Sequence, residues 1–521
     1  MTAPRVIAEP LGGSALSLAV QRGEFDASIV APAPRSAPEW KARAQTVARE
    51  VSARWFDDLR PAFGDERGAP DRLARTARAG GVVVTTGQQA GLFGGPIYTW
   101  SKALAALALA DALERATGVP AAPVFWAATD DADFAEASRT YVVRNGGVAC
   151  LELGAPPPAG TPMSLAPLGD ATPLLARLRE ACGSMAYERA YAAVEDAYRA
   201  SPTVGGAYVR LLRALLAPLG IAVLDASHPA VRRAGAGVAR RALERAADVS
   251  RALAARQAWL VKRGFEPQVA DVPALSTVFV YERGAKRRVP LPEAAALANA
   301  DGAELGPNVL LRPVVERAVL PTVAYVAGPG ELAYFTQVSA VAEALGAAQP
   351  VAVPRWSCTI VEPAVERALE RLGAGVDDLR DTTALERRVA RAAIPDEVRQ
   401  ALVDLRGAVS EKVALLAARD AAYPEGALLE HAVVEGAARQ LEFRIDRLER
   451  RLAAAAKRRG SEALRDLQVA RDALWPTGHR QERTLNFVPL LARYGDALWT
   501  AMQASAGSYA ARLVTGVGDG G

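Results

Sequence analysis

A short apolar segment followed at once by a glycine-rich loop is the feature that most restricts the fold of this chain. Residues 81–86 read GVVVTT, a β-branched run typical of a strand buried on both faces of a parallel sheet. A loop covers residues 88–96, residues 97–115 have a helical pattern, and residues 119–128 (VPAAPVFWAA) predict the next strand. This order predicts a β-loop-α-β unit with a ligand site at the carboxyl ends of its strands.

Further strands are predicted at residues 220–225 and 322–327, which gives an α/β core with a parallel sheet over residues 1–360. Two insertions are expected in this core. The first, at about residues 154–219, begins with the Pro- and Gly-rich stretch GAPPPAGTPMS and continues as helix, and the second, at about residues 264–305, has strand and turn character. The length of 521 residues favours such additions, because it exceeds what one hydrophobic core usually serves.

Charged helical sequence occupies residues 361–474. Its clearest pattern is an apolar seam at alternating spacings of four and three, typical of a coiled coil: Leu441, Ile445, Leu448, Leu452 and Ala455. A break at Gly460 and a similar stripe over residues 464–474 indicate an antiparallel hairpin, and residues 402–416 could supply a further helix. We expect a helical arm that forms a homodimer, followed by a segment, residues 475–521, that packs back on the core.

The composition argues against several classes of protein. There are 62 basic and 58 acidic residues and no long basic run, so a nucleic-acid partner is not expected. The three cysteines lack the spacing of a zinc site or a disulfide framework, which fits a reducing cytoplasm. The sequence predicts no signal peptide and no membrane span, and we predict no metal site.

The glycine-rich loop is the strongest candidate for ligand binding. Gly87, Gly91 and Gly94 would let the backbone approach a ligand closely, and free amides at the start of the following helix would attract an anion. Gln88 and Gln89 offer uncharged donors and acceptors that suit a polar substrate. The loop has neither the GxGxxG spacing nor the GK[ST] of a Walker loop. A tight turn that only packs helix on strand explains the same residues equally well.

Three carboxylates crowd the end of the second strand: Asp130, Asp131 and Asp133. We consider Asp131 and Asp133 candidate catalytic residues, because such groups bind amines, hold Mg²⁺ or act as general bases. The alternative is an Asp-rich helix N-terminus, in which Asp130 or Asp131 caps the helix. Both this segment and the glycine loop come at adjacent strand ends, where the site of an α/β protein is expected.

Other candidates lie further along the chain. Arg312 and Arg355 could each clamp a carboxylate bidentately, or each could belong to a structural ion pair. Tyr98 follows the glycine loop and could face a substrate. Gly328 and Gly330 flank Pro329 after the strand at residues 322–327, and their amides could bind an anionic part of a cofactor.

Five motifs together resemble the BshC family of bacillithiol-synthesis cysteine ligases. TTGQQAGLFGGPIYT (residues 85–99) and PVFWAATDDADF (residues 123–134) are similar to its GQQxGLFxGPLYT and PVFWxxxEDHDF segments. The stretch from NVLLRP through PTVAYVAGPGELAYFTQ, the segment PRWSCT, and QER after Trp475-Pro476 follow in the order found in the family. The resemblance covers about residues 81–495.

This resemblance implies a Rossmann-like core of the HUP and class I synthetase type, with two connecting insertions and a dimerising coiled coil. It implies a ligase that joins L-cysteine to glucosaminyl-malate through an amide, the last step of bacillithiol synthesis. An adenine nucleotide (ATP or ADP) is implied by the fold more than by any residue. The other functions that we consider are a different HUP-type ligase or nucleotidyltransferase, and a dimeric ligand-binding scaffold that has lost catalysis.

One departure from the family pattern bears on activity. Where the family has EDHDF, this chain has Asp130-Asp131-Ala132-Asp133-Phe134, so the histidine is replaced by Ala132. If that histidine is an acid, a base or a phosphate contact, its loss would cost roughly 10²–10⁴-fold in rate.

Overall fold

The computed structural model describes residues 3–64, 71–144, 147–270, 272–392, 394–424, 426–459 and 461–516. The chain divides into two compact units. The larger contains the residues up to Ile360 together with those from His479 onward, and the smaller spans Val361–Gly478. The predicted helix break at Gly460 and the last five residues of the predicted C-terminal segment lie outside the described residues.

The larger unit is built on a parallel five-stranded sheet with the order β11-β10-β2-β3-β6. Its strands are β2 (Val82–Gln89), β3 (Ala121–Ala128), β6 (Ala222–Asp225), β10 (Thr322–Ala327) and β11 (Ala352–Pro354). The chain runs outward from β2 through β3 to β6 and then returns to the other side of β2. The predicted Rossmann-like fold is confirmed, and the reversal of strand order between β2 and β10 is where such sheets bind ligands.

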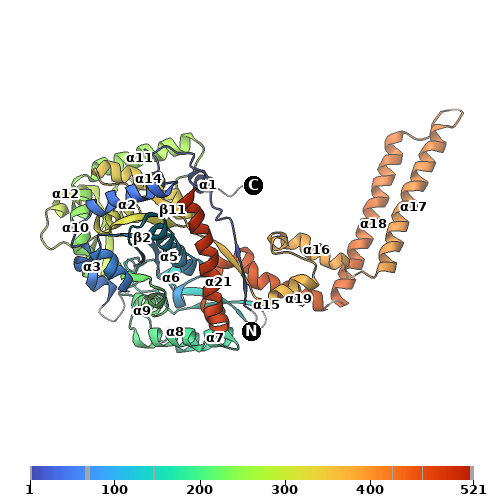
Figure 1. Cartoon of the computed structure of the whole chain (residues 1–521). Coiled ribbons are helices and arrows are strands. Elements are labelled where there is room, and N and C mark those ends of the chain that lie inside the picture. The colour runs from blue at the N-terminus through green and yellow to red at the C-terminus, as the bar shows by residue number, and fades with distance from the viewer. Residues whose placement is uncertain are drawn as a thin grey trace. The chain divides into compact units, whose positions relative to one another are not determined.

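Helices cover both faces of the sheet (Figure 1). On one face α5 (Ile97–Thr117) is buried along almost its whole length beneath α21 (Val488–Thr515) and beside α2 (Ala37–Glu50). On the other face lie α10 (Pro229–Glu244) and α14 (Pro329–Leu345). Alanines fill much of α5, and their small side chains let a helix pack closely on two sides. The two helix layers keep the carboxyl ends of the strands in fixed register.

The two connecting segments carry their own secondary structure. After β3 come α6 (Phe134–Ala137), the hairpin β4 (Arg139–Arg144) and β5 (Gly147–Glu152), and then α7 (Thr172–Cys182), α8 (Glu188–Ala200) and α9 (Val204–Leu216). The second segment forms the antiparallel sheet β8-β7-β9, from β7 (Leu275–Glu282), β8 (Ala285–Pro290) and β9 (Leu305–Pro307), with α12 (Leu291–Ala298). The β4–β5 hairpin begins before residue 154 and was not predicted from the sequence.

Shorter elements complete the larger unit. They are β1 (Arg5–Ala8), which pairs with β12 (Cys358–Val361), α1 (Ala15–Gln21), α3 (Trp55–Phe63), α4 (Asp71–Arg78), the 3-10 turn η1 (Leu92–Gly94), α11 (Ala246–Lys262), α13 (Arg312–Val319) and α20 (Gln481–Thr484). No helix in the described parts of the chain is long and apolar enough to cross a membrane.

The smaller unit is helical. It contains α15 (Pro363–Arg371), α16 (Thr382–Ala392), α17 (Asp396–Ala421), α18 (His431–Arg459) and α19 (Ser461–Leu474). The predicted hairpin of α18 with α19 is wrong, because α18 pairs with α17 and α19 packs on α15. Arg406 of α17 forms ion pairs with Asp446 and Glu449 of α18, and Ile445 of the predicted seam is buried. The stripe in residues 402–416 therefore belongs to the helix that packs against α18 at Ile445, while Leu441 and Leu448 of the seam stay exposed.

Candidate active site

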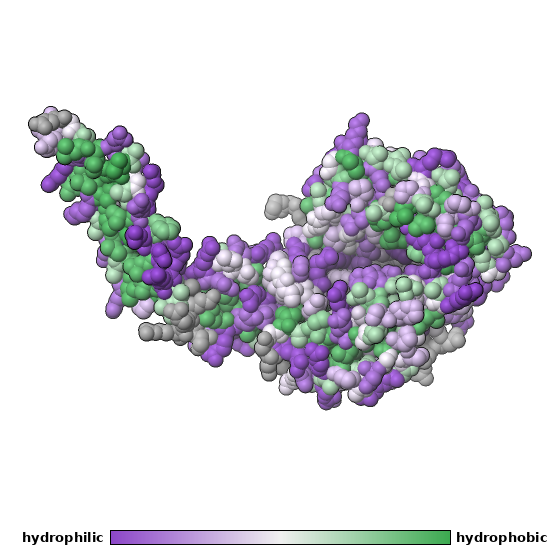
Figure 2. All heavy atoms as spheres, turned by 180° about the vertical axis from the view of Figure 1, so that it is seen from behind, coloured by the Kyte–Doolittle hydropathy of each residue, from purple (hydrophilic) through white to green (hydrophobic). Residues whose placement is uncertain are grey.

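A cavity of about 810 Å³ opens at the carboxyl ends of β2, β3 and β10, within the larger unit. Figure 2 shows the larger unit hollowed, with mostly hydrophilic side chains around the hollow. Nine of the predicted site residues line the cavity: Gly87, Gln88, Gln89, Tyr98, Asp131, Arg312, Gly328, Gly330 and Arg355. Gly91, Gly94 and Asp133 do not line it. The cavity thus lies where the reversal of strand order predicts a ligand.

Hydrogen bonds of its backbone amides and carbonyls hold the loop after β2 in place. The amide of Phe93 donates to the Tyr198 hydroxyl at 2.5 Å, and those of Gly94 and Gly95 donate to carbonyls within the loop. The Asn486 side chain donates to three further loop carbonyls. The predicted anion site was at the start of the following helix, α5, where the amide of Ile97 donates to the Leu485 carbonyl and that of Thr99 to the Pro96 carbonyl. At these two positions the expectation of free amides is wrong.

Gly91 and Gly94 are explained by packing. A Cβ at Gly91 would lie 2.8 Å from the Gly95 Cα, and one at Gly94 would lie 2.6 Å from the Trp100 ring. Gly94 also has a φ of 86°, which side chains disfavour. A ligand contact at either glycine stays a prediction.

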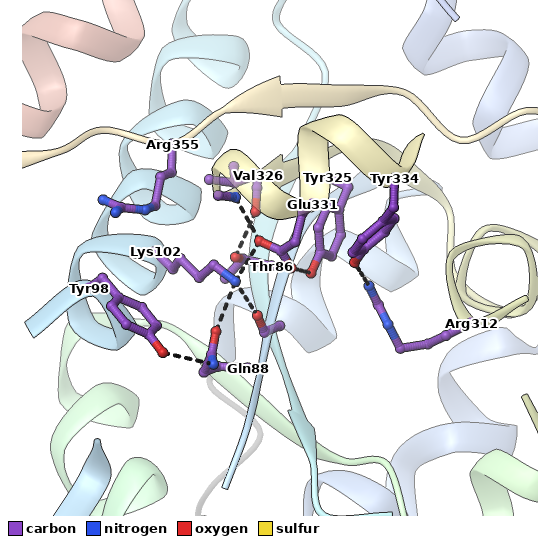
Figure 3. A network of polar contacts seen from close by, with 12 residues as sticks. Thr86, Gln88, Tyr98, Lys102, Arg312, Tyr325, Val326, Glu331, Tyr334 and Arg355 are labelled. Carbon is purple, nitrogen blue, oxygen red and sulfur yellow. Dashed lines mark hydrogen bonds and ion pairs between the residues drawn. The ribbon is translucent and has the colours of Figure 1, made fainter. Parts of the chain in front are cut away.

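A buried lysine connects the end of β2 to the start of α14 (Figure 3). The ammonium of Lys102 lies 2.8 Å from the carbonyl oxygen of Gly87, 3.0 Å from the Gln88 side-chain oxygen and 2.6 Å from a carboxylate oxygen of Glu331. Glu331 also accepts hydrogen bonds from the Tyr325 hydroxyl and the Gly328 amide. Burial alone would raise the pKa of Glu331, but Lys102 and these hydrogen bonds hold it below its usual value. The network fixes the two sides of the strand-order reversal to each other.

Both predicted arginines line the cavity with their charges already paired. Arg312 forms an ion pair with Glu316 at 2.7 Å and donates to the Tyr334 hydroxyl at 3.2 Å. Arg355 forms a two-pronged pair with Glu482, with distances of 2.9 and 2.7 Å, and is only 2% exposed. The structural ion pair, one of the two alternatives weighed for each arginine, is present at both positions. Clamping of a substrate by either arginine stays a prediction.

The carboxylates after β3 divide into different environments. Asp133 is exposed and caps α6 by accepting from the Glu136 amide at 3.0 Å, so the capping residue is neither Asp130 nor Asp131. Asp131 lines the cavity, accepts from the Ala132 amide at 2.7 Å and lies 3.6 Å from the Lys286 ammonium. Burial raises the pKa of Asp130, although Lys286 opposes the shift. Asp131 is therefore the predicted catalytic carboxylate that the fold brings to the cavity.

Glu136 reaches the cavity from the first turn of α6. Its carboxylate accepts from the Tyr98 hydroxyl at 3.4 Å, and the Gln88 side chain donates to the same hydroxyl at 3.3 Å. Partial burial raises the pKa of Glu136, and the carboxylates of Asp133 and Asp131 raise it further. A carboxylate with a raised pKa is a stronger base than an ordinary one.

The second connecting segment supplies residues that sequence reasoning missed. Lys286 on β8 donates to the Asp130 carbonyl at 2.6 Å, and its ammonium lies 4.7 Å from the Phe279 ring centre. Arg288 and Gln268 also line the cavity. These residues lie more than 130 positions from β3 and follow no motif, so only the tertiary fold brings them to the site.

No group of three or more His, Cys, Asp or Glu residues that could hold a metal ion occurs within the described ranges. His228 caps α10 by accepting from the Ala230 amide at 3.1 Å. The three cysteines are free.

Comparisons with known proteins agree with this architecture. The family described as "Bacillithiol biosynthesis BshC, N-terminal Rossmann-like domain" matches residues 39–356, and "Bacillithiol biosynthesis BshC, C-terminal coiled-coil domain" matches residues 358–510. A protein of Solibacter usitatus named "Putative cysteine ligase BshC" is 35% identical over 445 residues, which cover 81% of this chain and 82% of that protein. A protein of Koribacter versatilis with the same name is 32% identical over 464 residues, 84% of this chain and 85% of its own.

Proposed function

This chain belongs to the BshC family of bacillithiol biosynthesis, and we propose that it forms the amide bond between L-cysteine and glucosaminyl-malate, the last step of that synthesis. The observation that carries the proposal is the cavity at the reversal of strand order, which presents both carboxylates and cations. Cysteine contributes a carboxyl group and the aminosugar contributes an amine. A site for their condensation must bind both kinds of charge and remove a proton from the amine.

We assign the amine to the carboxylate side of the cavity. Asp131 would hold the ammonium of the aminosugar, because its position is fixed by the Ala132 amide and by Lys286. Glu136, with its raised pKa, would take one proton from this ammonium, so that the neutral amine can attack the carboxyl carbon of cysteine. Asp133 acts through the helix that it caps, since α6 carries Glu136 into the cavity.

The nucleotide proposal depends on the start of α14. Gly328 and Gly330 line the cavity, and a Cβ at Gly330 would meet only the Gln268 side chain, at 3.8 Å. The Gly328 amide already donates to Glu331, so its predicted role in binding an anion is not supported, and a phosphate group would approach at Gly330 in the first turn of α14. We propose that an adenine nucleotide binds there, with Lys286 and Arg312 as neighbouring cations. When bound, ATP would supply the phosphoryl or adenylyl group that makes a carboxyl oxygen of cysteine a leaving group. ATP and reduced cysteine are cytoplasmic solutes, so we place the reaction in the cytoplasm.

The experiment is an incubation of the full chain with cysteine, glucosaminyl-malate and ATP, with mass detection of the amide. Product that depends on all three components supports the proposal, and its absence at high enzyme concentration contradicts it. Ala132 favours a second candidate, a scaffold that binds the ligands without turnover, because it lines the cavity where the family has histidine. Calorimetric binding of glucosaminyl-malate without product formation would support that scaffold.

Ala132→His tests the role of the missing histidine. Ala132 borders the cavity, so the new imidazole would lie beside Asp131, which favours its protonated form. We expect turnover of cysteine and glucosaminyl-malate to rise by about tenfold or more. A change within about twofold in a folded variant would show that this position carries no chemistry.

We also propose that the helical unit forms a homodimer. Several large apolar side chains of α17 and α18 are exposed, and Figure 2 shows hydrophobic surface along these helices: Val403, Leu416, Leu441, Phe443 and Leu448. A second copy would remove this surface from water. Phe443→Asp with Leu448→Asp should give monomers by light scattering, while the control Arg447→Asp, which removes no apolar side chain, should leave the mass unchanged. A parent chain that is monomeric at micromolar concentration would overturn the proposal.

A further inference from the structure

Most cations around the cavity are already committed to partners in the protein. The pairs are Lys102–Glu331, Lys286–Asp131, Arg312–Glu316 and Arg355–Glu482, with nitrogen–oxygen distances of 2.6, 3.6, 2.7 and 2.7 Å. Arg288 donates twice to the Ser276 carbonyl. A carboxylate oxygen of the substrate would have to compete with these partners for each cation.

Arg483 on α20 is the exception. It is exposed, it lines the cavity, and its guanidinium has no hydrogen bond or ion pair with any residue that the structure describes. Its neighbours in sequence are both buried and anchored. Gln481 exchanges hydrogen bonds with the backbone of Ile360, and Glu482 holds Arg355. The backbone that carries Arg483 is thus fixed, while its charged end remains available to a ligand.

We propose that Arg483 binds a carboxylate of the malyl group of the acceptor and so sets the preference for a dicarboxylate-bearing aminosugar. This inference rests on the proposed function. The carboxyl group of cysteine is the reacting group and is consumed, whereas both malyl carboxylates survive the reaction and need a cation throughout. A guanidinium without an internal partner binds a carboxylate with two parallel hydrogen bonds and displaces no protein group.

The surroundings of Arg483 make its charge necessary on this side of the cavity. Tyr98 is close enough to Arg483 for the guanidinium to oppose the rise in the tyrosine's pKa, which is caused mainly by burial. The same tyrosine donates to Glu136, whose carboxylate would repel a malyl group. Without Arg483, a doubly charged acceptor would meet net repulsion there.

The test compares two acceptors in the cysteine ligation assay: glucosaminyl-malate and methyl glucosaminide, which has no carboxylate. Arg483→Gln should raise the KM for glucosaminyl-malate by about 10- to 100-fold and leave kcat, the KM for cysteine and the KM for ATP nearly unchanged. Activity on methyl glucosaminide should not change. Arg483→Lys should recover part of the lost affinity for glucosaminyl-malate, because lysine keeps the positive charge but cannot form two parallel hydrogen bonds.

Arg480→Gln is the matched control. Arg480 lies three residues away, donates to the Pro10 carbonyl at 2.6 Å and does not line the cavity, so its loss should leave both acceptors unaffected. Equal losses on both acceptors, or an unchanged KM, in Arg483→Gln would overturn the inference. A rise in the KM for ATP alone would assign Arg483 to phosphate instead and would also overturn it.

A binding measurement separates this inference from the proposed function. If the parent chain forms no amide, the proposed function fails, and titration calorimetry with L-malate as the probe then decides the role of Arg483. Malate binding that is lost in Arg483→Gln and kept in Arg480→Gln would support carboxylate recognition without ligation. A parent chain that does not bind malate would reject both.

Discussion

Two glycine-rich turns flank the reversal of strand order, and their glycines have different surroundings. The turn after β2 has its amides bonded within the protein, and its glycines face Gly95 and the Trp100 ring. The turn after β10, at Gly328 and Gly330, borders the cavity and has room around Gly330. The first turn gave the stronger sequence signal, yet the open space lies in the second turn, beside Gly330, while the Gly328 amide is bonded to Glu331.

The difference teaches that a glycine in a turn does not by itself show whether the protein or a ligand occupies the space where a side chain would be. At Gly94 the space is filled by Trp100, which in turn stacks on Phe487 of the C-terminal segment. At Gly330 the nearest atoms belong to the end of the Gln268 side chain. Substitutions in the two turns should therefore separate stability from ligand binding.

The largest effect is expected from Gly94→Ala. The new Cβ would lie 2.6 Å from the Trp100 ring, and the residue would have to keep a φ of 86°. Backbone strain and overpacking together should lower the free energy of unfolding by about 4 kcal/mol, measured by denaturant titration. Gly118→Ala is the control, because Gly118 has a φ of 71° but nothing within 4 Å of its Cβ, so only strain of about 1 kcal/mol remains. Equal losses of unfolding free energy in the two variants would show that the protein relieves the contact between the new Cβ and Trp100.

The sequence predicted the sheet well because the central strands are apolar on both faces and end at turns. The β10 strand matches its predicted limits, and β3 and β6 begin within two residues of theirs. Periodicity also located the arm helices, but it could not say which helix covers the seam at Ile445, because α17 and α19 both present apolar stripes. Pairing depends on the connections between helices, which no local pattern records.

The site was predicted in outline for a similar reason. Gln88 lies near the end of β2, Asp131 lies in the connection after β3, and Gly330 lies in the first turn of α14, so the fold class alone places them at one edge of the sheet. Lys286 lies in an inserted hairpin, and Glu482 is more than 120 residues from Arg355. Such residues pair with charged side chains that are distant in the sequence, so the sequence alone does not reveal the pairs.

A smaller loss of stability is expected from Glu331→Gln, which changes the second turn without crowding it. The variant leaves the buried Lys102 ammonium without a carboxylate, although the Gly87 carbonyl and the Gln88 side chain still accept from it. We expect a loss of about 3 kcal/mol in the free energy of unfolding by denaturant titration. A loss below about 1 kcal/mol would mean that Lys102 is neutral in the folded protein, a form that its burial favours.

The pH dependence of stability should change in the same variant. The pKa of Glu331 is lowered in the folded protein from its model-peptide value of 4.5, so the unfolded chain takes up the proton first as the solution is acidified. Its contribution is fully present above pH 4.5 and is lost as the pH falls through the lower folded pKa. Stability measured between pH 6 and pH 3 should therefore fall less steeply in Glu331→Gln than in the parent chain. Parallel curves would show that Glu331 titrates normally.

The smallest effect on stability is expected from Gly330→Ala, and it completes the contrast with Gly94. Gly330 lies in the first turn of α14, has no positive φ, and its added Cβ would meet only the movable end of Gln268. Alanine also favours a helix, so the free energy of unfolding should change by less than about 0.5 kcal/mol. The methyl group would nevertheless project where we place the nucleotide, and we expect the Kd for ATP, measured by calorimetry, to rise by about 3- to 10-fold. If Gly330→Ala changes neither the Kd for ATP nor the stability, the nucleotide does not bind at this turn. If a folded Gly94→Ala variant also keeps the Kd of the parent chain, neither turn contacts the phosphates.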